Sequence, residues 1–141
     1  MTRVRWLAAV LVVSLVLGVC APASAAPPPP PVPPDVAFTL LTPLPTDLAV
    51  GEEYTVDVLV EADQPFVMCI SLVDVYYPAY IQNFGDVARG GTSAVLHVKL
   101  IGRRSTAGLP GGATWFAVAA GARYGGGYVA THLFEGMLAV H

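Results

Sequence analysis

Three observations predict an all-β fold for this chain, an antiparallel β-sandwich of about seven strands. First, apolar and polar residues alternate in several segments after residue 35, which is the period of a half-buried strand. Second, turn signals rich in glycine or proline separate these segments at intervals of about 10 to 15 residues. Third, no segment after residue 25 keeps an apolar period of 3.6 residues, so helices are not expected.

The first 25 residues have the order of a secretory signal peptide. Two arginines precede an apolar stretch at residues 7–19, and Ala23-Ser24-Ala25 provides a cleavage site of the small-x-small kind. The apolar stretch is shorter than the roughly 20 residues that a membrane-spanning helix needs. We therefore expect cleavage after Ala25 and no membrane span in the mature chain. The alternative is lipid attachment at Cys20, which would anchor the protein to a membrane.

Residues 26–34 form a proline tract. Consecutive prolines hold the polyproline II conformation and extend about 3.1 Å per residue, so the tract predicts a stiff spacer of roughly 25 Å. The remaining residues, 35–141, are expected to form one β-sandwich domain, which is long enough to build its own core.

The strands of this domain follow in order along the chain. Segment 53–62 alternates most clearly, and segment 66–77 is apolar on both faces, as expected of a central strand. The last segment, 128–140, is expected to be broken by a bulge near Gly136. The expected strands span residues 36–41, 53–62, 66–77, part of 80–88, 92–101, 113–124 and 128–140.

One segment resembles a known family. Leu48-Ala49-Val50-Gly51-Glu52-Glu53-Tyr54-Thr55-Val56-Asp57-Val58 is similar to the first turn and second strand of immunoglobulin-like modules in bacterial exported proteins, where a Val-Gly-Glu turn leads into an alternating strand. The resemblance implies an immunoglobulin-like strand order, A to G. Such modules serve as spacers, adhesion units or binding domains. The cysteine pair and the core tryptophan of antibody domains are absent, because Cys69 has no partner after cleavage and Trp115 falls on the sixth strand.

Charge and composition limit the partners. Without the two arginines of the leader, the chain has five basic and ten acidic side chains, a net charge near −5. A nucleic-acid surface needs several basic residues, so nucleic acid is not expected as a partner. Since charged residues make up only 12% of the chain, we expect part of its surface to be covered by a protein, a polysaccharide or a second copy.

No catalytic or metal-binding motif is found in the sequence. His97, His132 and His141 are not accompanied by a nucleophile signature, and no spacing typical of zinc ligands occurs, so neither a metal nor a cofactor is expected. Cys69 lies in an apolar run and is expected in the core. Its alternative is an intermolecular disulfide.

The tyrosines of the last hairpin are candidate ligand contacts. Tyr124 and Tyr128 flank three glycines and are expected to oppose each other across the hairpin. Gln64 is expected nearby, because two loops of an immunoglobulin-like sandwich share this end. Tyrosines beside a flexible loop give contact area at a low entropy cost.

A second group of tyrosines is expected at the opposite end of the sandwich. It consists of Tyr76, Tyr77 and Tyr80, after the third strand. Arg103 and Arg104, in the glycine-rich segment after the fifth strand, are a separate candidate for binding an anion.

The sequence therefore predicts an exported, non-catalytic structural or interaction module at the cell exterior, either secreted or held at the cell surface. A soluble protein that binds carbohydrate or an envelope polymer through its tyrosine loops is the alternative. A small exported enzyme is the third hypothesis.

Overall fold

The computed structural model of the chain describes residues 26–29 and 32–141. The predicted signal peptide and Cys20 lie outside these residues, so cleavage and lipid attachment stay predictions. Residues 26–29 are exposed and carry no regular secondary structure, and a compact unit runs from Pro33 to His141. None of the described residues belongs to a helix long and apolar enough to cross a membrane.

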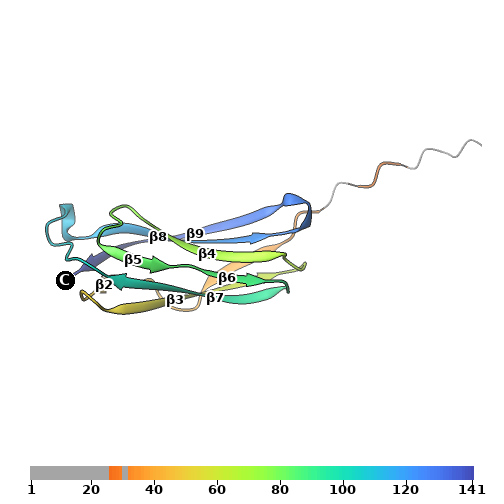
Figure 1. Cartoon of the computed structure of the whole chain (residues 1–141). Coiled ribbons are helices and arrows are strands. Elements are labelled where there is room, and N and C mark those ends of the chain that lie inside the picture. The colour runs from red at the N-terminus through yellow and green to blue at the C-terminus, as the bar shows by residue number, and fades with distance from the viewer. Residues whose placement is uncertain (1–25, 30–31) are drawn as a thin grey trace, which may run out of the picture. The chain divides into compact units, whose positions relative to one another are not determined.

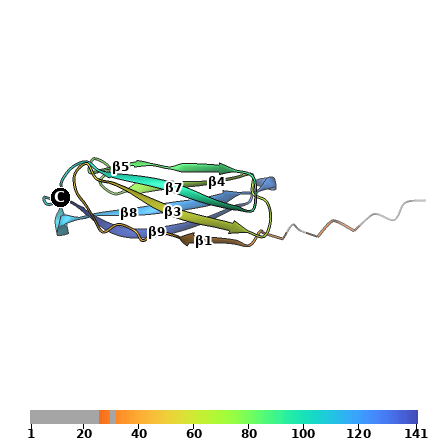
Figure 2. The ribbon, with the colours of Figure 1, turned by 90° about the horizontal axis from the view of Figure 1, so that it is seen from below.

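Two β-sheets form the compact unit (Figures 1 and 2). One sheet has the order β1-β3-β7-β5 and the other β2-β9-β8-β4-β6, and each pair of neighbours is antiparallel except β2 with β9. The first sheet comprises β1 (Val36–Leu40), β3 (Glu53–Ala62), β7 (Ser93–Gly102) and β5 (Ile81–Phe84). The second comprises β2 (Asp47–Leu48), β9 (Val129–Val140), β8 (Thr114–Arg123), β4 (Met68–Val75) and β6 (Asp86–Arg89).

The region 80–88, expected to hold one strand, contains two strands that belong to different sheets. β5 pairs with β7, the chain crosses over at Gly85, and β6 pairs with β4. A Cβ atom at Gly85 would lie 2.5 Å from the carbonyl oxygen of Ser71, so only glycine fits at this crossing. Alternation in the sequence reports which side of a strand is buried and not which sheet the strand joins.

The chain changes sheet a second time near its start. β1 pairs with β3 in the four-stranded sheet, whereas β2 pairs with β9 in the other. β2 has only two residues, which is too short for a pattern, and the sequence prediction missed it. The described residues therefore form nine strands instead of about seven. The strands β1 and β5 lie at opposite edges of the four-stranded sheet, as Figure 2 shows.

The last hairpin is regular. β8 and β9 pair in continuous register from Thr114–Leu138 to Arg123–Val129, so the predicted bulge near Gly136 is wrong. Gly136 lies opposite Phe116, and a Cβ atom on it would be 3.1 Å from the ring of Phe116. The glycine makes room for this ring and does not bend the strand.

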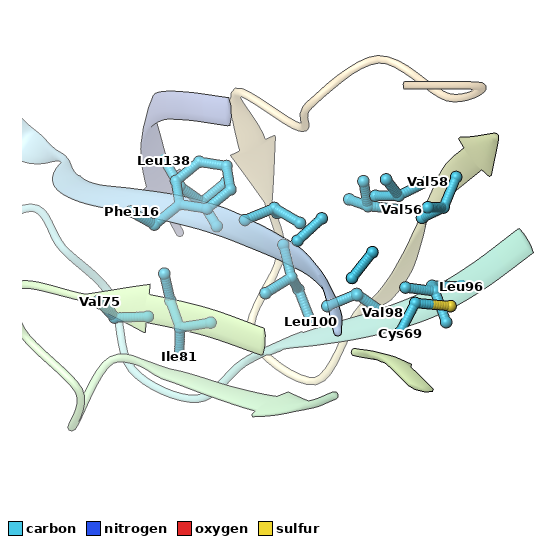
Figure 3. Packing of buried hydrophobic residues seen from close by; sticks show 14 of the residues in the cluster. Val56, Val58, Cys69, Val75, Ile81, Leu96, Val98, Leu100, Phe116 and Leu138 are labelled. Carbon is cyan, nitrogen blue, oxygen red and sulfur yellow. The ribbon is translucent and has the colours of Figure 1, made fainter. Parts of the chain in front are cut away.

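The core lies between the sheets, where alternate residues of both meet (Figure 3). Cys69 belongs to it, as the sequence predicts, with no exposed surface. Burial raises the pKa of its thiol, because the thiolate would lose its hydration. The largest fully buried side chains are those of Phe116, Leu48, Ile81, Leu96, Leu100, Leu138, Val56, Val58, Val60, Val98, Val118 and Val140.

Candidate functional site

The two hairpin tyrosines pair as predicted, but their exposure differs from the prediction. The backbone N–H of Tyr124 donates to the carbonyl of Tyr128 at 2.9 Å, and the ring centroids are 6.0 Å apart. Tyr124, however, is only 5% exposed and packs in the core. This differs from the predicted pair of surface contacts, because only Tyr128 and Gln64 remain accessible at this end.

The Tyr124 hydroxyl is buried without a hydrogen-bond partner in the described part of the chain. Burial raises the pKa of Tyr124, and the negative charge of Asp63 raises it further. The ring therefore contributes packing, while its hydroxyl costs free energy where it lies.

The second tyrosine group lies at the other end of the sandwich. The rings of Tyr76 and Tyr77 meet edge to face, with centroids 4.7 Å apart, and Tyr80 follows at 6.1 Å from Tyr77. The guanidinium of Arg104 lies 5.4 Å from the Tyr80 ring centroid. Arg104 therefore contacts the tyrosine group, although the sequence analysis treated the arginines as a separate candidate site. Arg103 is exposed beside them. Edge-to-face rings do not form a flat stacking surface.

The histidines lie apart from one another. His97 Nδ1 is 2.6 Å from Asp57 Oδ1, on the outer side of the four-stranded sheet. His141 Nδ1 is 2.9 Å from Asp47 Oδ1. His132 lies between the rings of Phe38 and Phe134.

A shallow pocket of about 210 Å³ opens beside the start of β1. Its lining consists of Asp35, Ala37, Glu61, Ala62 and Asp63. The backbone N–H of Asp35 donates to Asp63 Oδ1 at 2.9 Å, so part of this acidic lining holds the chain's entry into β1. None of the predicted ligand residues lines this pocket.

The outer faces of the two sheets differ in chemistry. The outer face of the four-stranded sheet carries two ion pairs, Asp57 with His97 and Glu53 with Lys99 at 3.0 Å, and it also exposes Phe84 and Val95. The outer face of the five-stranded sheet is mostly apolar, and we call it the apolar face. It consists of Val129, Thr131, Leu133, Glu135 and Met137 on β9, Trp115, Ala117, Ala119, Gly121 and Arg123 on β8, Met68, Ile70, Leu72 and Asp74 on β4, and Val87 and Arg89 on β6.

At the centre of the apolar face β8 presents the small residues Ala117, Ala119 and Gly121, and larger residues lie on the strands beside it. Ala119 of β8 pairs in register with Leu133 of β9 and with Leu72 of β4. Leu133 is 56% exposed and Leu72 is 53% exposed, whereas the core leucines Leu96 and Leu100 have no exposed surface. Apolar side chains are therefore exposed on both strands that flank β8.

Part of this face could be predicted from the sequence. Segment 66–77 is apolar on both sides, and we read it as a central strand. β4 is indeed flanked by β8 and β6, but its outer side is uncovered in the described residues. In β8, the outer positions Ala117, Ala119 and Gly121 are small and gave no sign of a surface site.

The fold of the chain is similar to that of a solved structure of another protein. No model of a protein family matches the chain, and no curated protein matches it. Among solved structures it is similar to domains 4 and 5 of the S-layer protein SbsC, with 13% identity and a TM-score of 0.49. The match covers 76% of this chain and 53% of the other, so this chain spans about half the length of that structure. At this level of similarity, the neighbour's role does not transfer.

Proposed function

We propose that the chain is an exported, non-catalytic interaction module with an immunoglobulin-like sandwich, and that its apolar face binds a macromolecular partner at the cell exterior. The strand orders β1-β3-β7-β5 and β9-β8-β4 correspond to the A-B-E-D and G-F-C sheets of that fold and support this part of the proposal. The order of residues 1–25 supports export.

One observation carries the binding function, which is the contrast between the two outer faces. Exposed leucine and methionine on β4 and β9 flank small residues of β8, whereas the outer face of the other sheet carries two ion pairs among its exposed side chains. Leaving such a face in water costs free energy of about 25 cal/mol for each Å² of apolar surface. A partner that covers the face recovers that free energy, and a flat sheet suits a macromolecule better than a small ligand.

The test is retention at the cell envelope of an exporting bacterial host. The processed chain should begin at Ala26 by N-terminal sequencing, and wild-type protein should remain with the envelope fraction. Val87→Ser, on the apolar face, should shift the protein into the medium. Val95→Ser is the matched control, because Val95 is a similarly exposed strand valine on the other sheet, at 39% against 46%.

Equal distribution of the two serine variants would contradict binding to a component of the cell envelope through the apolar face. Protein that stays inside the cell with residues 1–25 attached would contradict export.

A further inference from the structure

We propose that the apolar face binds the same face of a second copy of this chain, with the strands of the two copies antiparallel. In this arrangement Arg123 of each copy lies between Asp74 and Glu135 of the other. The inference rests on the proposed function and names the partner of the same surface.

The charged residues of the apolar face lie in two rows. Met68 pairs in register with both Arg123 and Arg89, so two arginines share a row near the hairpin loop. Ala117 pairs with both Asp74 and Glu135, so two carboxylates share a second row, six residues away along β8. At about 3.3 Å per residue the rows are about 20 Å apart.

These four charges are exposed and have no partner of opposite sign within the described residues. The ion pairs found there join His97 with Asp57, Lys99 with Glu53 and His141 with Asp47, and none includes a residue of the apolar face. A basic row and an acidic row on one surface are thus available to a partner with the reverse order.

The charge order selects one of two symmetric arrangements. Two identical faces oppose each other about a two-fold axis that lies in the interface. If the strands of the stacked sheets stay within about 30° of each other, this axis runs close to the strand direction or close to perpendicular to it. An axis along the strands places arginines opposite arginines, and the repulsion disfavours it. An axis across the strands near Ala120 inverts the rows, so that the basic row of each copy meets the acidic row of the other. The dimer then has two such contacts between a basic and an acidic row, one at each end of the interface.

The same operation fits the side chains at the centre. It places Gly121 opposite the Ala119 of the second copy, where two small residues let the sheets approach. It also places Leu133 opposite Thr131 and so sets a large residue against a small one. Stacked sheets pack about 10 Å apart with their strands within about 30° of each other, which this arrangement allows.

The size of the face predicts a weak dimer. Four strands at about 4.8 Å spacing and about 20 Å between the charged rows give a footprint near 500 Å² per copy with the side chains, or about 1,000 Å² in total. That is the lower limit of specific interfaces. We therefore expect a dissociation constant in the micromolar range.

Sedimentation velocity across the micromolar range tests the proposal, with the processed chain purified from an exporting host. Wild type should dimerise, and Arg123→Glu should raise the dissociation constant about tenfold or more, because it places a carboxylate among carboxylates. Arg103→Glu makes the same change of net charge outside the face and should leave the constant within about twofold. The double variant Arg123→Glu with Glu135→Arg should recover part of the lost affinity, because the new carboxylate at position 123 then meets the new guanidinium at position 135 of the second copy while Asp74 stays acidic. Thermal melts of each variant check that the fold is intact.

Each other outcome overturns the proposal in a distinct way. A wild-type chain that stays monomeric at all concentrations refutes self-pairing, while the envelope retention of Val87→Ser against Val95→Ser still tests the interaction module by itself. A dimer that responds equally to Arg123→Glu and Arg103→Glu uses another surface. The open edge of β9 before Ala139, where pairing with β2 begins, would then be the interface. Loss without recovery in the double variant refutes the antiparallel order.

Discussion

Thr106 is expected to be the residue that holds the loop between β7 and β8 against the end of β9. Its side chain has no exposed surface, its hydroxyl donates to the carbonyl of Gly112 at 2.6 Å, and it accepts the Val140 N–H at 2.8 Å. The Thr106 N–H donates in turn to the Val140 carbonyl at 2.8 Å. Valine has nearly the same shape, so Thr106→Val removes the hydroxyl and leaves the packing in place.

The free-energy cost follows from the two groups that lose their partner. Val140 is 1% exposed, so its N–H would be left buried and unpaired, at about 1–3 kcal/mol, and the bond to Gly112 adds about 1 kcal/mol. We expect Thr106→Val to lower the free energy of unfolding by about 2–4 kcal/mol, which for a domain of this size lowers the Tm by about 10 °C.

Urea unfolding followed by circular dichroism measures this change. Thr106→Ser is the control, because it keeps the hydroxyl and should cost about 1 kcal/mol or less. If valine and serine destabilise the domain equally, the hydroxyl bonds are not the cause and the reasoning is refuted.

Three further predictions concern stability. Tyr124→Phe removes a buried hydroxyl that has no partner, so it should leave stability unchanged or raise it by about 1 kcal/mol in urea unfolding; a clear loss would show that the hydroxyl is paired. Burial raises the pKa values of Tyr124 and Cys69, so both groups lose their protons at a lower pH in the unfolded chain than in the folded one. The free energy of unfolding should therefore be full below about pH 9 and fall as the pH rises. The fall should be less steep in Tyr124→Phe. Gly85→Ala should cost about 2 kcal/mol or more by thermal melting, since its Cβ would meet the Ser71 carbonyl, whereas Gly108→Ala, with open space around it, should be nearly neutral.

The period-two pattern predicted the strands well and their partners poorly. β3 has the expected bounds, Glu53–Ala62, because one of its faces is buried and the other is polar. The crossing at Gly85 was missed, because the segment 80–88 was assigned to a single strand and only the spatial approach of Ser71 reveals the change of sheet. The two residues of β2 are held by their pairing with β9, which local sequence cannot show.

The burial of Tyr124 could have been predicted. The inner positions of β8 are Phe116, Val118, Ala120 and Ala122, and the same parity continues to residue 124. The prediction that Tyr124 contacts a ligand was based instead on the glycine loop that follows it. By contrast, no local signal joins Arg104 to Tyr80, because a turn of the chain and a long strand pair separate them.

The apolar face needs its charges for specificity as much as its leucines for affinity. Apolar side chains such as Leu72 and Leu133 gain free energy against almost any apolar surface, so alone they would favour non-specific association. The rows of Arg89 with Arg123 and of Asp74 with Glu135 make most alignments costly, since a shift or a parallel arrangement places like charges together or leaves them desolvated and unpaired. Only one antiparallel register satisfies all four charges and the apolar centre together. A surface of this kind selects its own copy by excluding the other alignments, and so the charge-reversal pair at residues 123 and 135 is a sharper probe of the interface than any single apolar truncation.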